Sequence, residues 1–333
     1  MTITLGINGF GRIGRSILRA ILESGRDDMR VVAINDLADL ENMAHLLEFD
    51  SVHGRLRRPI TTGDGVLDVG TGPIRVTHVA SPDALPWQDV DIALECTGHF
   101  RTAALAGLHL KNGAGKVLVS APAKINDIKT VVMGVNDAAI TADDTIISNG
   151  SCTTNCLAPV AHLLHEAYGI VRGTMTTVHC YTGVQPVHDA YGKTLNRARA
   201  ASLSMIPTTT GAAEAVEAVL PHLKGRLFGT SIRVPVPNVS CIDLTVEVQR
   251  ETSTCAVNAL FSQAAHGPMA RIMAVTSTPM VSVDLNHDPM SATVALDQTH
   301  VQDKTMIRVL AWYDNEWGFS NRMIDIAERL ALS

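Results

Sequence analysis

The sequence TITLGINGFGRIGRSILRAILESGRDDMRVVAIND, residues 2–36, predicts a strand, a glycine-rich turn, a helix and a second strand. Residues 2–8 form a short apolar run that leads straight into glycines. Residues 13–21 place apolar side chains on one helical face, and Gly25 predicts the end of that helix. Residues 30–36 form a second apolar run that ends in an acid. A β-α-β unit of this kind implies a parallel sheet with a right-handed crossover.

The turn in this unit matches the dinucleotide-binding pattern Gly9-x-Gly11-x-x-Gly14, and Asp36 lies 22 residues after Gly14. Glycines permit a tight turn, close approach of the backbone to a pyrophosphate and close packing of helix on strand, and the acid bonds ribose hydroxyls. The helix N-terminus attracts the phosphates. Strand, helix and spaced acid together favour this interpretation over an ordinary glycine-rich turn.

More strand-like runs follow, and the pattern changes near residue 150. The first half alternates strands with helical or loop stretches, which is typical of a doubly wound sheet; its further strands are expected at 74–76, 90–95, 116–120, 130–133 and 145–148. In the second half, residues 241–248 alternate apolar and polar side chains, as in a half-exposed antiparallel strand. Its other strands are expected at 173–179, 231–234, 280–283 and 306–312, and an amphipathic helix at 321–330.

The fold class is therefore α/β, a Rossmann-type doubly wound parallel sheet plus an α+β domain with a mainly antiparallel sheet. A dinucleotide-binding domain is expected at 1–150, completed by a C-terminal helix at 316–333, with the second domain at 151–315. The length of 333 residues suits two domains, and 46% hydrophobic with 18% charged residues permits a large core.

Composition excludes several classes of function. The net charge of −6 argues against a nucleic-acid-binding protein, so an anionic substrate needs locally placed positive charge. The six cysteines are scattered and form no metal-ligand set, which indicates reduced thiols. The sequence begins without a signal-peptide pattern and has no run long enough to span a bilayer. We expect a soluble cytoplasmic protein with no metal and no membrane partner.

The segment SCTTNC, residues 151–156, precedes a helical pattern. A helix N-terminus stabilises a thiolate, so Cys152 is a candidate nucleophile, although a small buried cysteine is the commoner case. His179 follows 27 residues later at the end of an expected strand. An imidazole can take the thiol proton, so the two residues are a candidate catalytic pair, with a structural histidine as the alternative.

Longer motifs resemble the phosphorylating glyceraldehyde-3-phosphate dehydrogenase family. They occur in the family's order along nearly the whole chain: SCTTNC at 151–156, HCYTG at 179–183, RARAA at 197–201, PTTTGAA at 207–213, RVP at 233–235 and WYDNEWG at 312–318. The resemblance makes 151–315 the catalytic domain and implies NAD as cofactor, a homotetramer and a glycolytic role.

The resemblance also implies a role for each matching residue. Cys152 attacks the aldehyde, His179 acts as base, and the resulting thioester is cleaved by inorganic phosphate. The substrate phosphate is assigned to Thr182 and Arg233, and the attacking phosphate to Ser151, Thr153, Thr210 and Gly211. The cofactor is assigned to Gly9, Gly11, Arg12, Ile13, Gly14, Asp36, Ser120 and Asn315.

Four positions depart from the family pattern. Val184 replaces an acid beside the substrate-phosphate site, Phe319 lacks a hydroxyl near the nicotinamide, and Ala80 replaces an adenine-side arginine. Ala190-Tyr191 stands where strictly NAD-dependent members have Leu-Pro. Asp36 repels a 2′-phosphate, so the expected cofactor is NAD, with tolerance of NADP.

Two other functions compete. Residues 189–191 and 283–289 lean toward erythrose-4-phosphate dehydrogenase, a relative with the same cysteine–histidine chemistry. Residues 208–211 retain the attacking-phosphate motif, which favours glyceraldehyde 3-phosphate. The third hypothesis is an inactive binding protein on the same scaffold, because a fold alone does not establish activity.

Overall fold

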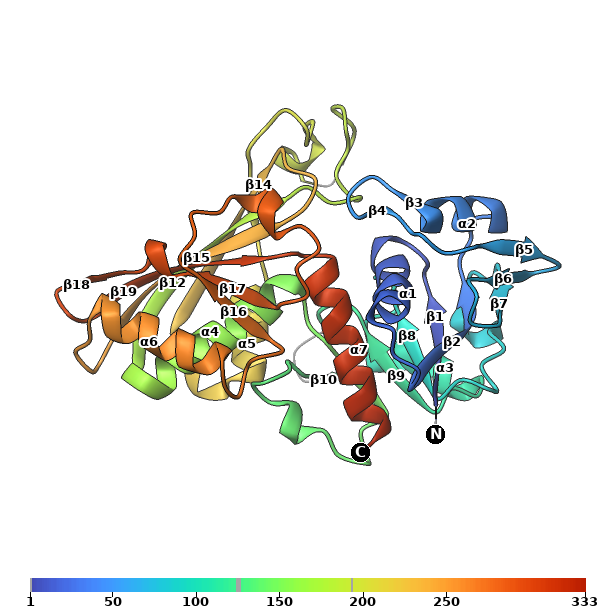
Figure 1. Ribbon diagram of the computed structural model, residues 1–333, viewed down its shortest axis with the longest axis horizontal. Coiled ribbons are helices and arrows are strands. Elements are labelled where there is room, and N and C mark those ends of the chain that lie inside the picture. The colour runs from blue at the N-terminus through green and yellow to red at the C-terminus, as the bar shows by residue number, and fades with distance from the viewer. Residues whose placement is uncertain (1, 124–126, 193) are drawn as a thin grey trace. The chain divides into compact units, whose positions relative to one another are not determined.

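A computed structural model describes residues 2–123, 127–192 and 194–333. The chain divides into two compact units (Figure 1). The first unit comprises Met1–Val131, Asp137–Ser151 and Ser320–Ser333, and the second comprises Val132–Asn136 and Cys152–Phe319.

A nine-stranded sheet forms the centre of the first unit. Its strand order is β10-β11-β9-β8-β1-β2-β7-β6-β5, parallel from β10 to β7 and antiparallel at β6 and β5. The strands are β1 (Ile3–Asn8), β2 (Met29–Asn35), β5 (Thr61–Gly63), β6 (Val66–Asp68), β7 (Pro73–Thr77), β8 (Ile92–Glu95), β9 (Lys116–Val119), β10 (Lys129–Thr130) and β11 (Ile146–Ser148). The expected Rossmann-type parallel sheet is confirmed.

The helices of this unit follow from the same sequence patterns. Helix α1 (Arg12–Ser24) buries its apolar face, and Gly25 ends it with a left-handed φ of 67°, as expected. The helix expected at 321–330 is part of α7 (Trp317–Ala331), where the Lys116 ammonium donates to the Leu330 carbonyl at 2.7 Å. The remaining elements are α2 (Leu40–Glu48), α3 (Ala103–Lys111) and the small hairpin β3 (Phe49–Asp50) and β4 (Gly54–Arg55).

The second unit contains a mixed sheet, mainly antiparallel as expected, in the order β13-β14-β12-β15-β19-β17-β16, with β18 pairing β19. In β15, alternate side chains are buried, which confirms the predicted alternation. Helices α4 (Cys152–Tyr168), α5 (Ala212–Val219) and α6 (Thr254–Ala265) lie along one face (Figure 1). The strands are β12 (Ile170–Cys180), β13 (Ile206–Thr209), β14 (Leu227–Val234), β15 (Ser240–Val248), β16 (Met273–Thr276), β17 (Ala292–Ala295), β18 (His300–Gln302) and β19 (Met306–Tyr313).

Two predicted strands are wrong or too long. In the run 130–133, β10 ends at Thr130 and the Val131 N–H still donates to the Ser148 carbonyl at 2.8 Å, but the Val132 N–H bonds the Asn136 side chain instead of a strand. The run 280–283 is not a strand. A 3-10 turn occupies Ser282–Leu285, and the Asp284 carboxylate accepts the Val281 N–H at 2.9 Å. In both places a backbone N–H donates to a nearby side-chain oxygen and not to the carbonyl of a neighbouring strand, which the apolar composition of the run had predicted.

Candidate active site

Helix α4 begins at Cys152, directly after the turn that follows β11. Most of its first three turns are buried in the second unit, and Cys156 has no exposed surface. Cys156 therefore packs in the core, whereas Cys152 is partly accessible at the helix start. The two thiols of the SCTTNC segment have different environments, and only the first can meet a substrate.

His179 reaches Cys152 from the penultimate position of β12. The His179 Nε2 atom lies 3.5 Å from the Cys152 Sγ, so the expected cysteine–histidine pair is in contact. The parallel register of β12 with β14 places Arg233 opposite His179. Sequence-distant residues therefore meet because two strand ends and a helix start converge in one unit.

The other ring nitrogen of His179 has two neighbours. Nδ1 lies 2.8 Å from the Cys180 carbonyl oxygen and 2.7 Å from the Arg233 guanidinium, which also donates to that carbonyl at 2.9 Å. The carbonyl favours a proton on Nδ1, which leaves Nε2 free to accept the thiol proton. The guanidinium can only donate and favours a bare Nδ1. The ring tautomer therefore depends on where Arg233 directs its hydrogens.

Burial controls the protonation of the pair. Desolvation, followed by the charge of Arg233, lowers the pKa of His179 to about 3. Desolvation also raises the pKa of Cys152, although Arg233 and then the side chain and N–H of Thr153 oppose it. The contacts at the helix start lower the Cys152 pKa, as expected, but the cost of burying a thiolate has the larger effect. Both shifts favour the neutral thiol and the neutral imidazole near pH 7, so nucleophilic attack requires proton transfer between them.

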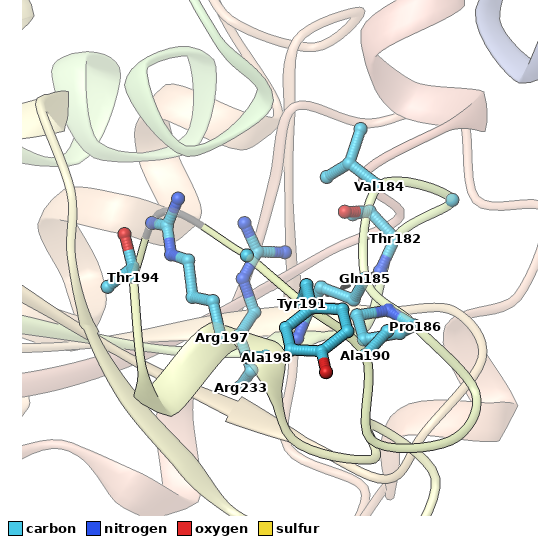
Figure 2. A pocket seen from close by; sticks show the side chains of 12 residues that line it. Thr182, Val184, Gln185, Pro186, Ala190, Tyr191, Thr194, Arg197, Ala198 and Arg233 are labelled. Atoms are coloured by element: carbon cyan, nitrogen blue, oxygen red, sulfur yellow. Dashed lines mark hydrogen bonds between the residues drawn. The ribbon is translucent and has the colours of Figure 1, made fainter.

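An open cavity of about 460 Å³ lies beside Arg233 in the second unit. Thr182, Arg197 and Arg233 line it, and Figure 2 shows the two guanidinium groups extending toward the same side. Arg197 is held there because its Nε donates to the Thr208 hydroxyl at 2.6 Å. Val184 lies on its rim with 90% of its side chain exposed. Two arginines without a carboxylate among the lining residues make a cavity suited to an anion.

The residues assigned to the attacking phosphate lie at helix starts. Thr210 and Gly211 precede α5, and the Thr210 hydroxyl accepts the Ala212 N–H at 3.2 Å. Ser151 directly precedes α4. The Thr153 hydroxyl is buried and lies 2.9 Å from the Tyr313 hydroxyl, so its side chain supports the core of the site.

The first unit has its own cavity of about 470 Å³ beside the glycine-rich turn. Gly9, Gly11 and Asp36 line it, as do residues 96–97. A Cβ on Gly9 would lie 2.7 Å from the Thr97 nitrogen, and φ at Gly9 is +94°. A Cβ on Gly14 would lie 2.3 Å from the Gly9 oxygen, whereas Gly11 faces open space. A tightly packed turn with an open central glycine fits a dinucleotide pyrophosphate.

The other predicted cofactor residues have varied surroundings. Asp36 accepts the Phe10 N–H at 2.6 Å. Arg12 and Ile13 are in the first turn of α1, and the Arg12 guanidinium pairs with Asp50. The backbone N–H of Ser120, just after β9, donates to the Glu95 carbonyl at 3.0 Å.

Asn315 belongs to the second unit. It follows β19, is 7% exposed, and its Oδ1 contacts Cys180 and Ser240. Sequence reasoning missed these two neighbours: Cys180 lies in the HCYTG motif but has no role assigned there, and Ser240 lies in none of the quoted motifs.

No group of three or more histidine, cysteine, aspartate or glutamate side chains in the described part of the chain is arranged to hold a metal ion. No helix within those residues is both long and apolar enough to cross a membrane.

Comparison with known proteins identifies both halves. Residues 3–103 match the family model "Glyceraldehyde 3-phosphate dehydrogenase, NAD binding domain", and residues 151–315 match "Glyceraldehyde 3-phosphate dehydrogenase, C-terminal domain". The glyceraldehyde-3-phosphate dehydrogenases of Cereibacter sphaeroides and Xanthobacter flavus are 60% and 56% identical to this chain, each over 98% of both proteins. That of Geobacillus stearothermophilus is 50% identical over 99% of both. With a cysteine–histidine pair, an arginine-lined cavity and a glycine-rich nucleotide turn, the chain belongs to the glyceraldehyde-3-phosphate dehydrogenase family.

Proposed function

We propose that this protein oxidises glyceraldehyde 3-phosphate with NAD and inorganic phosphate and releases 1,3-bisphosphoglycerate. The observation that carries the proposal is the 3.5 Å contact between Cys152 Sγ and His179 Nε2, with Arg233 common to this pair and the anion cavity. The names of the relatives support the same activity.

Cys152 forms the covalent bond in this reaction. As Sγ attacks the aldehyde carbon, its proton passes to His179 Nε2 and on to the carbonyl oxygen, which gives a hemithioacetal. His179 then removes the hydroxyl proton as hydride leaves the same carbon. NAD held at the glycine-rich turn would supply the hydride acceptor. A phosphate oxygen attacks the thioester carbon, the bond from that carbon to Sγ breaks, Sγ regains the proton that His179 holds, and the acyl phosphate forms.

Arg233 and Thr182 are proposed to bind the substrate phosphate. A planar guanidinium donates two hydrogen bonds to phosphate, and Arg233 already faces the cavity. When Arg233 turns to the phosphate, the Cys180 carbonyl is the remaining partner of His179 Nδ1. That arrangement favours the tautomer in which Nε2 is the base. Ser151, Thr153, Thr210 and Gly211 are proposed to bind the attacking phosphate.

We assign the binding of NAD to eight residues: Gly9, Gly11, Arg12, Ile13, Gly14, Asp36, Ser120 and Asn315. Asp36 disfavours a 2′-phosphate by repulsion, while Ala190-Tyr191 weakens the steric exclusion of NADP. Catalytic efficiency should therefore be higher with NAD than with NADP, with measurable turnover of both. A higher efficiency with NADP would contradict the assignment of Asp36.

Erythrose 4-phosphate is the competing substrate, favoured by Asp189-Ala190-Tyr191. Steady-state rates with each aldehyde, with and without inorganic phosphate, separate the two activities. We expect turnover of glyceraldehyde 3-phosphate, and only when inorganic phosphate is present. Faster, phosphate-independent turnover of erythrose 4-phosphate would replace the proposal with the competing one.

The same proposal extends to the whole molecule. We assign a dinucleotide-binding domain to residues 1–150, completed by helix 316–333, and a catalytic domain to residues 151–315. The family models match residues 3–103 and 151–315, which supports this division. We further propose a cytoplasmic homotetramer acting in glycolysis. Light scattering with chromatography tests the assembly, because a tetramer has four times the mass of the 35.6 kDa chain.

A further inference from the structure

Glu95 is a buried carboxylate to which the proposed reaction gives no role. The neighbouring parallel strands β8, β1 and β2 end in Glu95, Asn8 and Asn35, and their register places these three residues side by side. Glu95 is 1% exposed, and both asparagines are buried with it. The two asparagines also line the nucleotide cavity of the first unit. A buried carboxylate therefore lies next to the strand ends that border this cavity.

Each carboxylate oxygen of Glu95 accepts two hydrogen bonds. Asn8 Nδ2 donates to Oε2 at 2.6 Å, and His109 Nε2 lies 3.0 Å from the same oxygen. The backbone N–H of Thr97 donates to Oε1 at 2.8 Å, and the Thr97 hydroxyl donates to it as well. His109 is a donor here because its Nδ1 accepts the indole N–H of Trp87 at 2.8 Å, a group that can only donate. All four neighbours are therefore donors, and only a carboxylate accepts at both ends.

These bonds set the orientation of the amides at the cavity. Because Asn8 gives an amide hydrogen to Glu95, its Oδ1 is left to accept, and Asn35 Nδ2 donates to it at 2.8 Å. Asn35 Oδ1 in turn accepts the Val79 N–H at 2.8 Å. Asn8, Asn35 and Val79 all line the cavity. One carboxylate thus fixes the direction of hydrogen bonding along its border.

Thr97 connects the same carboxylate to the glycine-rich turn. The Thr97 hydroxyl donates to Glu95 and accepts the His99 N–H at 3.1 Å. A Cβ added to Gly9 would lie 2.7 Å from the Thr97 nitrogen, so the turn packs directly on this residue. The position of Thr97 therefore limits where the turn can lie, and Glu95 holds Thr97 through two hydrogen bonds.

We propose that Glu95 is a positioning residue for the dinucleotide, which fixes Asn8 and Thr97 where they shape the cavity beside the glycine-rich turn. This inference rests on the proposed binding of NAD in that cavity. Because Glu95 is buried, it acts on the cofactor through these two neighbours.

Calorimetric titration with NAD tests the proposal. Glu95→Gln keeps the size of the side chain, but whichever way its amide turns, the NH₂ group faces two donors. The unpaired groups should displace Asn8 or Thr97 and raise the Kd for NAD about five- to fiftyfold.

Asp91→Asn is the matched control for this variant. Asp91 precedes the opposite end of β8 and also links that strand to β1, since its carboxylate accepts both the N–H and the hydroxyl of Thr4 at 2.8 Å. Because this link lies at the amino end of the strands, Asp91→Asn should keep the wild-type Kd for NAD.

Variants of Thr97 separate hydrogen bonding from packing. Thr97→Val keeps the shape of the side chain but loses the hydroxyl, and should raise the Kd for NAD about two- to tenfold. Thr97→Ser keeps the hydroxyl and should recover most of that loss. In a Glu95→Gln background, Thr97→Val should have little further effect, because the hydroxyl acts through the carboxylate.

Steady-state kinetics distinguish positioning from a smaller amount of folded protein. Loss of folded protein lowers the rate but leaves both KM values unchanged, whereas a displaced cavity wall raises KM for NAD and leaves KM for the aldehyde unchanged. Wild-type affinity for NAD in Glu95→Gln would overturn the inference alone, as would wild-type affinity in Thr97→Val if Glu95→Gln does not fold. Effects of the two substitutions that simply add would overturn it too. Absence of NAD binding in the wild-type protein would overturn the proposed function, and the inference with it.

Discussion

At the scale of single residues, the surroundings of Cys152 matter more than its position in a motif. The sequence places it at a helix start, which favours a thiolate, but burial has the larger effect on its pKa. His179 is similarly kept neutral by burial and by Arg233. Reactivity therefore depends on transfer of a proton over the 3.5 Å contact.

Replacing the nucleophile tests this arrangement first. Cys152→Ser should lower kcat by about a thousandfold or more, because a serine hydroxyl is a far weaker nucleophile than cysteine in the same place. Cys255→Ser is the control, since Cys255 is an exposed thiol on α6. Steady-state rates of NADH formation give the comparison. Substantial activity in Cys152→Ser would exclude the thioester route.

Arg233 is predicted to affect both the reactivity of Cys152 and the binding of the substrate phosphate, and one variant tests both effects. Its charge lowers the pKa of Cys152, so Arg233→Gln should slow alkylation of Cys152 by iodoacetamide at a fixed neutral pH, as less thiolate is present. Loss of charge-assisted bonds to phosphate should raise KM for the aldehyde about ten- to hundredfold. Unchanged alkylation with an unchanged KM would show that Arg233 serves neither role.

At the scale of elements, periodicity predicted most of the structure. The β1–α1–β2 unit and the alternating β15 follow from local patterns that act through backbone geometry and burial. The run 280–283 misled because its apolar composition carries no information about the Asp284 carboxylate that caps the turn. Contacts between distant elements, such as the triangle of Cys180, Ser240 and Asn315, leave no local signal and need the folded sheet.

The glycine-rich turn allows stability and binding to be separated. Gly14→Ala should destabilise the protein by about 1–3 kcal/mol, because the new Cβ would lie 2.3 Å from a backbone oxygen. Gly11→Ala meets nothing within 4 Å and should leave thermal stability unchanged while weakening NAD binding. Melting curves and NAD titrations of both variants check this. A stable, NAD-binding Gly14→Ala protein would contradict the packing argument.

At the scale of the whole molecule, one buried pair links stability to pH. The Asp50 side chain is 3% exposed and pairs with Arg12. Burial alone would raise its pKa, but Arg12 and the backbone N–H groups of His53 and Val52 outweigh this and lower it from 3.8 to about 2. A lowered carboxyl pKa stabilises the fold above pH 3.8, and this contribution disappears as the pH falls toward 2.

Asp50→Asn removes this dependence. At pH 6 the variant should be less stable than the wild type by about 1 kcal/mol, allowing for solvent screening at the exposed side of the pair. The difference should shrink as the pH is lowered toward 2. Urea unfolding at a series of pH values gives the two free energies. A difference that grows on acidification would reverse the assigned sign.

The nucleotide-binding residues could be predicted from the sequence more fully than the arrangement of the residues around Cys152. Gly9 to Asp36 lie on consecutive elements, so the nucleotide cavity could be predicted from spacing alone. The second unit brings together α4, β12 and β14. Their chemistry made Cys152 and His179 a candidate pair, but only the family motifs added Arg233 before the structure did. The shared position of Arg233 between His179 and the anion cavity was not predictable, since it depends on the register of β12 and β14.

In the proposed reaction one cysteine carries the substrate through aldehyde oxidation with NAD and through transfer of the acyl group to phosphate. NADH formation by the purified protein with glyceraldehyde 3-phosphate, with and without inorganic phosphate, tests it most directly. Sustained turnover only when phosphate is present is predicted, with at most one NADH per Cys152 before phosphate is added. Sustained phosphate-independent turnover, or no NADH formation under either condition, would contradict it.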